Sequence, residues 1–258
     1  MLRRLVPVAV AGLLVVAGCT AVPGGTTSTA TTGPTTETVD PAEADLPPGV
    51  NESGVGNASA LTAAHDATLR AEGFVLDGTF VRDPPNRGNQ TRTFDTVVAP
   101  GAERFRTAVE TVRYASDASD AVSQRSRTRV WSNATATLRA ATIAGETAVS
   151  SVEDLPPWLS LTRAPQYRSS LEMGEFAVEQ AVVRDGRTFT TLVAENATEA
   201  VGANATFDAR FVVDERGVVH EATVSVSTPG SEADYAHYEI VQLGGSPERP
   251  AWVDDRDD

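Results

Sequence analysis

The sequence predicts an α+β fold: a large curved antiparallel sheet, a half-barrel of about eight to eleven strands, with helices covering one face. Two observations predict it. After residue 73, apolar and polar residues alternate in many short segments separated by Gly, Pro, Asp and Asn. Helical spacing occurs in two places, before the first strand and in the middle of the chain. The helices are therefore segregated from long runs of strands.

The first expected element is an N-terminal helix over residues 60–72. Ser59 is placed to cap its start and Gly73 to end it. Its apolar stripe, which includes Leu61 and Leu69, is thin. The helix must therefore pack against a larger apolar surface.

Strands follow this helix. Residues 74–81 alternate and predict a half-buried strand, and two more strands are expected over residues 91–99 and 103–113. The inward-facing residues of these strands are Phe74, Leu76, Gly78, Phe80, Phe94, Val98, Phe105 and Val109.

The middle of the chain is less regular. Residues 127–152 are β-prone with a turn at Gly145, and residues 158–172 predict a short central helical segment interrupted at Pro165. Beyond it, Asp185-Gly186 is a two-residue hairpin signal. The remaining strands are expected over residues 175–183, 188–195, 206–213, 218–227 and 234–243.

The chain divides into four predicted parts. Residues 1–18 form a signal peptide, because basic residues precede an apolar run too short to span a bilayer. Residues 19–58 contain a lipidated Cys19 and a disordered linker rich in Thr, Gly and Pro. Residues 59–250 form the sheet domain, and residues 251–258 form a solvated acidic tail.

Cys19, the only cysteine, ends the sequence Val16-Ala17-Gly18-Cys19. This sequence resembles the lipobox of exported lipoproteins. The resemblance implies cleavage after Gly18, a membrane lipid joined to Cys19, and a protein on the extracellular face of the cell membrane. The pair Arg3-Arg4 fits either a twin-arginine or a general export signal.

The composition restricts the partners. The chain contains 21 basic residues, all arginine, and has a net charge of −14. Such an acidic chain is repelled by nucleic acid and by anionic lipid, so both are poor partner candidates and we expect no nucleic-acid partner. Acidic, lysine-free chains resemble proteins of salt-loving archaea, although a GC-rich genome also replaces lysine with arginine.

Six of the seven asparagines begin an Asn-x-Ser/Thr triplet. This excess predicts a glycoprotein and places these residues in exposed positions. The glycosylation candidates are Asn51, Asn57, Asn89, Asn133, Asn196 and Asn204.

The order of parts is similar to that of uncharacterised haloarchaeal surface lipoproteins. The shared features are the lipobox, the Thr-rich spacer, the segment from Leu61 to Phe74, and the closing Pro250-Ala251-Trp252. The hairpin over residues 211–219 also resembles one in lipoprotein carriers of the LolA and LppX type. That resemblance implies a half-barrel sheet wrapped over helices, with a hollow that holds acyl chains.

No motif identifies a reaction. His65, His220 and His237 lack metal-ligand spacing, and both HExxH and GxSxG are absent. We therefore expect no catalytic residue, no metal, no cofactor and no enzymatic activity.

Three functions are compatible with these observations. The first is a lipid-anchored surface protein that binds or carries a hydrophobic ligand such as a lipid. The others are a structural or adhesive glycosylated module without a pocket, and a hydrolase of unknown substrate. Aromatic side chains could line a pocket for an apolar ligand, although ordinary core packing explains the same residues and is the favoured interpretation. These candidates are Phe74, Phe80, Phe105, Trp131, Trp158, Phe207 and Phe211.

Overall fold

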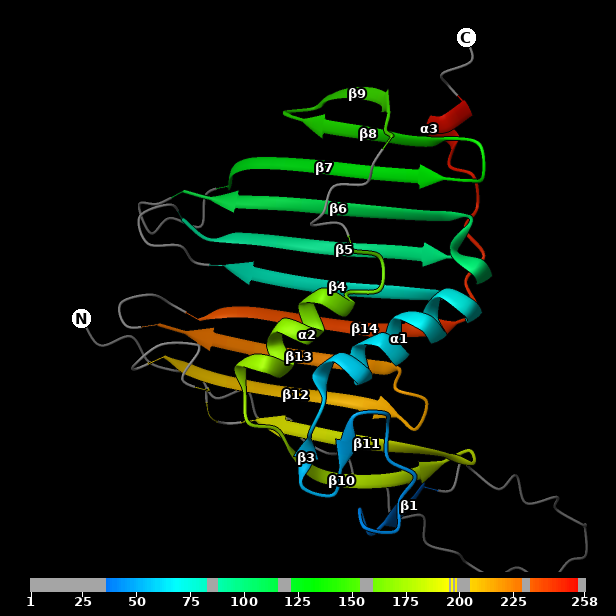
Figure 1. Cartoon of the computed structure of the whole chain (residues 1–258). Coiled ribbons are helices and arrows are strands. Elements are labelled where there is room, and N and C mark those ends of the chain that lie inside the picture. The colour runs from blue at the N-terminus through cyan, green and yellow to red at the C-terminus, as the bar shows by residue number, and fades with distance from the viewer. Residues whose placement is uncertain are drawn as a thin grey trace, which may run out of the picture. The chain divides into compact units, whose positions relative to one another are not determined.

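One antiparallel sheet of twelve strands forms the body of the computed structural model, which describes residues 36–82, 88–115, 122–153, 160–194, 196, 198, 205–228 and 233–254 (Figure 1). In spatial order the strands are β1 (Thr36–Val39), β10 (Ala177–Arg184), β11 (Arg187–Ala194), β12 (Thr206–Asp214), β13 (Val219–Ser227), β14 (Asp234–Leu243), β4 (Phe74–Arg82), β5 (Gln90–Val98), β6 (Phe105–Tyr114), β7 (Val122–Ser132), β8 (Thr137–Ile143) and β9 (Glu146–Ser151). The predicted α+β class is confirmed.

The chain builds the sheet in two halves, the first from the middle outwards and the second from the opposite edge back to the middle. Strands β4 to β9 follow one another across one half, and β10 to β14 fill the other. The two halves join where β14 pairs with β4, with Tyr238 directly opposite Gly78. The expected Asp185-Gly186 hairpin joins β10 to β11, with φ of 51° and 74° at its two central residues.

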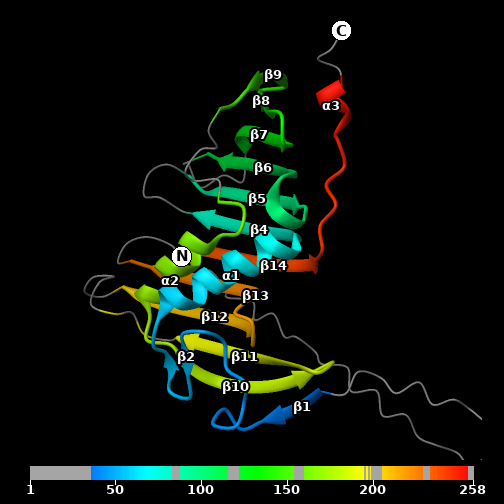
Figure 2. The ribbon, with the colours of Figure 1, turned by 45° about the vertical axis from the view of Figure 1, so that its right-hand side comes forward.

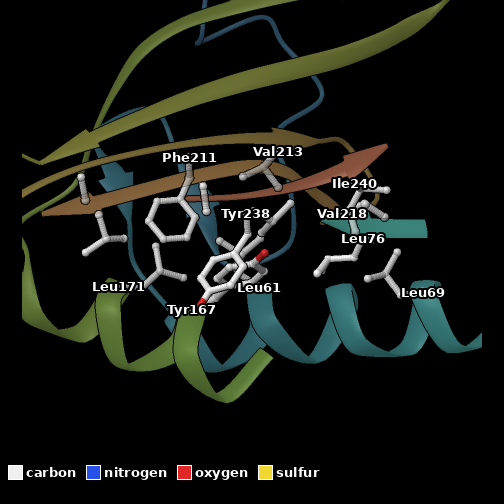
Figure 3. Close-up of a cluster of buried hydrophobic side chains, with 14 of the residues drawn as sticks. Leu61, Leu69, Leu76, Tyr167, Leu171, Phe211, Val213, Val218, Tyr238 and Ile240 are labelled. Carbon is white, nitrogen blue, oxygen red and sulfur yellow. The ribbon is translucent and has the colours of Figure 1, made fainter. Parts of the chain in front are cut away.

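Helices α1 (Ala58–Glu72) and α2 (Ala164–Met173) lie on the same face of the sheet (Figures 1 and 2). Both bury one side: α1 buries Leu61, His65 and Leu69, and α2 buries Tyr167 and Leu171. Figure 3 shows the Leu61, Leu69, Tyr167 and Leu171 side chains pointing toward the sheet, where they meet residues of β4, β12, β13 and β14. The main hydrophobic core therefore lies between the helices and the sheet.

Two details of the helices differ from the prediction. Asn57, not Ser59, caps α1, because its side-chain oxygen accepts a hydrogen bond from the Ala60 N–H at 3.0 Å. Pro165 does not interrupt α2 but lies in its first turn, where a proline needs no N–H donor.

The folded part begins earlier than predicted. β1 pairs with β10 at one edge of the sheet, and β2 (Val50–Asn51) pairs with β3 (Gly54–Val55). The prediction of a disordered linker over residues 19–58 is therefore wrong from residue 36 onward. β1 has mostly exposed side chains, so its place depends on backbone pairing that composition does not reveal.

The folded part also ends later than predicted. The short helix α3 (Ala251–Asp254) packs buried Val253 against Trp131 and Leu138. Because these apolar contacts hold the segment on the sheet, the acidic tail does not begin at residue 251.

A further short helical turn, η1 (Pro100–Ala102), lies between β5 and β6.

Candidate functional site

A cavity of about 330 Å³ lies between α2 and strands β13, β14 and β4. Its apolar lining includes Phe80, Tyr167, Met173, Val224, Val226 and Tyr238. The volume falls at the lower end of the range for small-molecule sites. Its position under a helix, on the apolar face of the sheet, makes it the candidate ligand site.

Small side chains on both walls explain why this space stays open. Across the sheet, Ala236 of β14 stands between Val224 of β13 and Phe80 of β4, in register with both. On the helix side, Ser169 and Ser170 of α2 complete the lining. A larger side chain at position 236 would fill the space above the strand, because opposite residues on adjacent strands are close neighbours.

Tyr238 forms part of the cavity wall. Its ring lies over Gly78, where a Cβ atom would overlap it. The ring also packs edge-on against Tyr167, with centroids 5.9 Å apart, and both rings lie between helix and sheet in Figure 3. Burial raises the pKa of both phenols, so they stay neutral.

Beyond Tyr238 lies Arg163, whose side chain is 2% exposed. Its guanidinium carbon lies 4.1 Å from the ring centroid of Phe94 and 5.4 Å from that of Tyr238. Its Nε and Nη2 atoms are buried without a hydrogen-bond partner. Cation–π contacts contribute about 0.5–2 kcal/mol, whereas burying an unpaired charge costs several kcal/mol. The two rings therefore do not offset the cost of burying this guanidinium. Burial accordingly lowers the pKa of Arg163.

The backbone at Arg163 is also unusual, because its φ of 61° is left-handed. Such a conformation costs a non-glycine residue roughly 1–3 kcal/mol and marks functional sites. Contacts of the preceding residue hold it in place. The Thr162 hydroxyl donates to Asp66 Oδ1 at 2.5 Å, and the Thr162 carbonyl lies 2.7 Å from His65 Nε2.

A second polar network braces the β12–β13 hairpin beside α1. The buried Asp214 carboxylate accepts hydrogen bonds from the Val218 N–H, the Arg216 guanidinium and His220. Arg216 also contacts Glu72 at the end of α1. Burial alone would raise the pKa of Asp214, but these hydrogen bonds outweigh it and lower the pKa to about 2. Their stabilisation is therefore lost as pH falls from 3.8 toward 2.

The cavity contains only one predicted pocket residue, Phe80. Phe74, Phe105, Phe207 and Phe211 are buried in the main core instead. Trp131 packs with α3 in a separate cluster on the other face of the sheet, and Trp158 lies outside the described residues. Of the six candidates that the structure describes, Phe80 lines the cavity and the other five pack in the two clusters, as the alternative of ordinary core packing predicts.

Sequence reasoning missed Tyr167, Tyr238 and Arg163. Alternation did contain a signal for Tyr238, since it shares a face with Ala236 and Ile240, which are both apolar. No comparable signal exists for Arg163, because an arginine before a helix is ordinarily exposed.

The histidines occupy three different settings. His65 is buried in α1 and accepts a hydrogen bond from the Val219 N–H at its Nδ1 atom. His220 contacts Asp214 on the same hairpin, and His237 contacts Thr223. In the described part of the chain, no group of three His, Cys, Asp or Glu side chains is arranged to hold a metal.

The glycosylation candidates are not uniformly exposed. Asn51, Asn57 and Asn196 are exposed, whereas Asn89 and Asn133 are half-buried. Asn204, like Cys19, lies outside the described residues. Modification of any of them stays a prediction. Within the described ranges, no helix has the length and apolarity needed to cross a membrane.

No family model matches the chain, and no curated protein matches it. Among solved structures, a LolA superfamily protein from Nitrosomonas europaea aligns with it at a TM-score of 0.26 and 7% identity. The alignment covers 76% of this chain and 96% of the other. Structural agreement this low contributes nothing to a functional assignment. The fold class rests on the strand order itself.

Proposed function

We propose that this protein is a lipid-anchored lipoprotein of the cell surface whose sheet-and-helix domain binds or carries a hydrophobic ligand, without catalysing a reaction. The observation that supports ligand binding is the apolar cavity between α2 and the sheet. The cavity of about 330 Å³ is partly open to solvent and its lining is mostly apolar, so an apolar guest molecule can enter it and bury apolar surface there.

The cavity favours this function over a structural or adhesive module, which needs no internal space. A hydrolase has less support. The contact between His220 and Asp214 belongs to the hairpin network, and neither residue lines the cavity. The proposed surface location and lipid anchor rest on the resemblance of the sequence around Cys19 to a lipobox.

Native mass spectrometry of the gently extracted full-length protein tests ligand binding. We expect a co-purifying lipid, and we expect Ala236→Phe to lose it, because the added ring fills the space between Val224 and Phe80. His237→Phe is the matched control: it is the next residue of β14, faces away from the cavity, and should keep the lipid. A wild-type protein that carries no lipid and binds no added dodecanol would contradict the proposal.

A further inference from the structure

We propose that the cavity takes a single-chain amphiphile with an anionic head group, a carboxylate or a phosphate, and that Arg163 binds this head group. The inference rests on the proposed function and names the ligand class for the same cavity. It goes beyond the binding of an apolar ligand because it names the residue that binds the polar head group.

The first argument is the unsatisfied state of Arg163. It is the only buried arginine among the described residues, and its Nε and Nη2 atoms lack a hydrogen-bond partner. Arginine has five N–H donors in a planar fork that matches a carboxylate or phosphate. A buried guanidinium without an acceptor is costly, and an anion bound to it would remove that cost.

The second argument is that Arg163 has no carboxylate partner among the described residues, although the chain is rich in acidic residues. Acidic residues outnumber basic ones, 35 to 21, yet no described Asp or Glu forms an ion pair with Arg163. Asp234, the acidic residue in the cavity lining, pairs with Arg82. The only contacts of the Arg163 guanidinium that the structure describes are with the rings of Phe94 and Tyr238.

The third argument is position. Tyr238 lines the cavity and its ring centroid lies 5.4 Å from the Arg163 guanidinium carbon, so the cation lies next to a lining residue, although Arg163 itself is not part of the lining. Arg92 of β5 is directly opposite Phe80, another lining residue. Burial and then the nearby Arg113 and Arg82 lower the pKa of Arg92, which indicates that cations gather on this side. An acyl chain in the cavity would therefore direct its head group toward positive charge.

The backbone supports the same conclusion. The left-handed conformation of Arg163 is maintained by hydrogen bonds between Thr162 and α1. Strain that the surrounding structure maintains is typical of binding sites. The strained residue places its guanidinium beside the rings of Phe94 and Tyr238.

The test measures binding of four probes to the full-length protein at one fixed salt concentration. Dodecanoate and dodecyl phosphate carry both the chain and an anionic head, dodecanol carries the chain alone, and inorganic phosphate carries the charge alone. We expect both anionic amphiphiles to bind at least tenfold more tightly than dodecanol, because hydrogen bonds to charged groups are the strong ones. Inorganic phosphate should bind far more weakly.

Variants then assign the effect to Arg163. Arg163→Met keeps the apolar stem and should reduce the affinity for dodecanoate to that for dodecanol, while dodecanol binding stays within about twofold. Arg163→Lys should retain part of the preference for anions. Arg168→Met is the control, since Arg168 is an exposed residue of α2 paired with Glu172.

Each other outcome has a distinct meaning. Equal affinity of wild type for dodecanoate and dodecanol overturns this inference and leaves the proposed function standing. Tight binding of inorganic phosphate alone overturns it too, because the site would then serve a free anion. If no probe with a chain binds, the proposed function fails as well. The comparison of the four probes on the wild-type protein tests the inference even where a variant does not fold.

Discussion

At the scale of single residues, His65 connects the covering helices to the sheet. It belongs to α1, its Nδ1 accepts the Val219 N–H at the start of β13, and its Nε2 lies 2.7 Å from the carbonyl of Thr162, just before α2. These contacts require a neutral ring with the proton on Nε2. Burial lowers the pKa of His65 to about 4.

This geometry predicts a pH dependence of stability. Between pH 6.5 and 4 the unfolded chain takes up a proton at His65 that the folded protein does not, so the free energy of unfolding falls by roughly 3 kcal/mol as pH decreases through that window. Urea unfolding at several pH values measures it. His65→Gln should lower stability at pH 7 by roughly 1–3 kcal/mol and remove this slope.

His237→Gln provides the control, because His237 lies on β14 with a side chain that is only half-buried and contacts Thr223. It should leave the slope between pH 6.5 and 4 unchanged. A wild-type slope that survives in His65→Gln would show that another group produces it.

At the scale of elements, the face of the sheet away from the helices carries a row of carboxylates. Glu221, Glu239, Asp77 and Asp95 are directly opposite one another across β13, β14, β4 and β5. Like charges opposite each other in a sheet are destabilising. Burial, and then the charges of Asp95 and Glu239, raise the pKa of Asp77. The repulsion between these carboxylates is a local instance of the self-repulsion that a net charge of −14 predicts for the whole chain.

Asp77→Asn should therefore stabilise the protein at low salt, by about 0.2–1 kcal/mol. The gain should shrink toward zero in molar salt, where the screening length falls to about 3 Å. Denaturant unfolding across a salt series measures this change. Glu103→Gln, at an exposed acid outside the row, is the control and should have no such salt-dependent gain. A gain that persists in molar salt would rule out charge repulsion as its cause.

At the scale of the whole molecule, the segment after β14 packs against the sheet at β7 and β8. Figure 1 shows the chain after β14 running past the ends of β4 to β7 to reach α3 beside β8. There Val253 and Trp252 cover Trp131 and Leu138, and the Arg129 guanidinium lies 5.4 Å from the Trp252 ring. The sequence Pro250-Ala251-Trp252, one of the features on which the sequence resemblance rests, therefore belongs to a segment that packs against the sheet.

The proposed lipid anchor is also a property of the whole molecule. We expect the N-terminal peptide of the wild type to begin at Cys19 with added lipid mass, and the protein to partition into detergent. Cys19→Ser should lose both, because serine lacks the thiol that accepts the lipid. Thr20→Ser is the control. A wild-type peptide without lipid, or a Cys19→Ser variant that partitions like wild type, would falsify the anchor.

Much of the sheet could be predicted because alternation is a local property. Each side chain of a strand faces opposite to its neighbour, so the strands over residues 74–81, 206–213 and 234–243 are readable without their partners. The Asp185-Gly186 turn is readable for the same reason, since its backbone depends on its own two residues.

The site could not be read in this way. Val130 and Trp131 are consecutive in β7, yet one joins the core under the helices and the other packs with α3. Alternation says that they differ in face, but not which face the helices cover. The same limit explains why Phe80 lines the cavity while Phe74, on the same face of the same strand, is wholly buried.

By itself, then, the sequence determined the α+β class, the positions of most strands and the expectation of export, because these depend on local spacing and composition. Tertiary structure alone decided that β14 lies beside β4, that α2 stands over Ala236 and that Arg163 is buried against Phe94 and Tyr238. The physical reason is that a binding site is made by side chains distant in the chain, whose neighbours are set by strand order and helix packing.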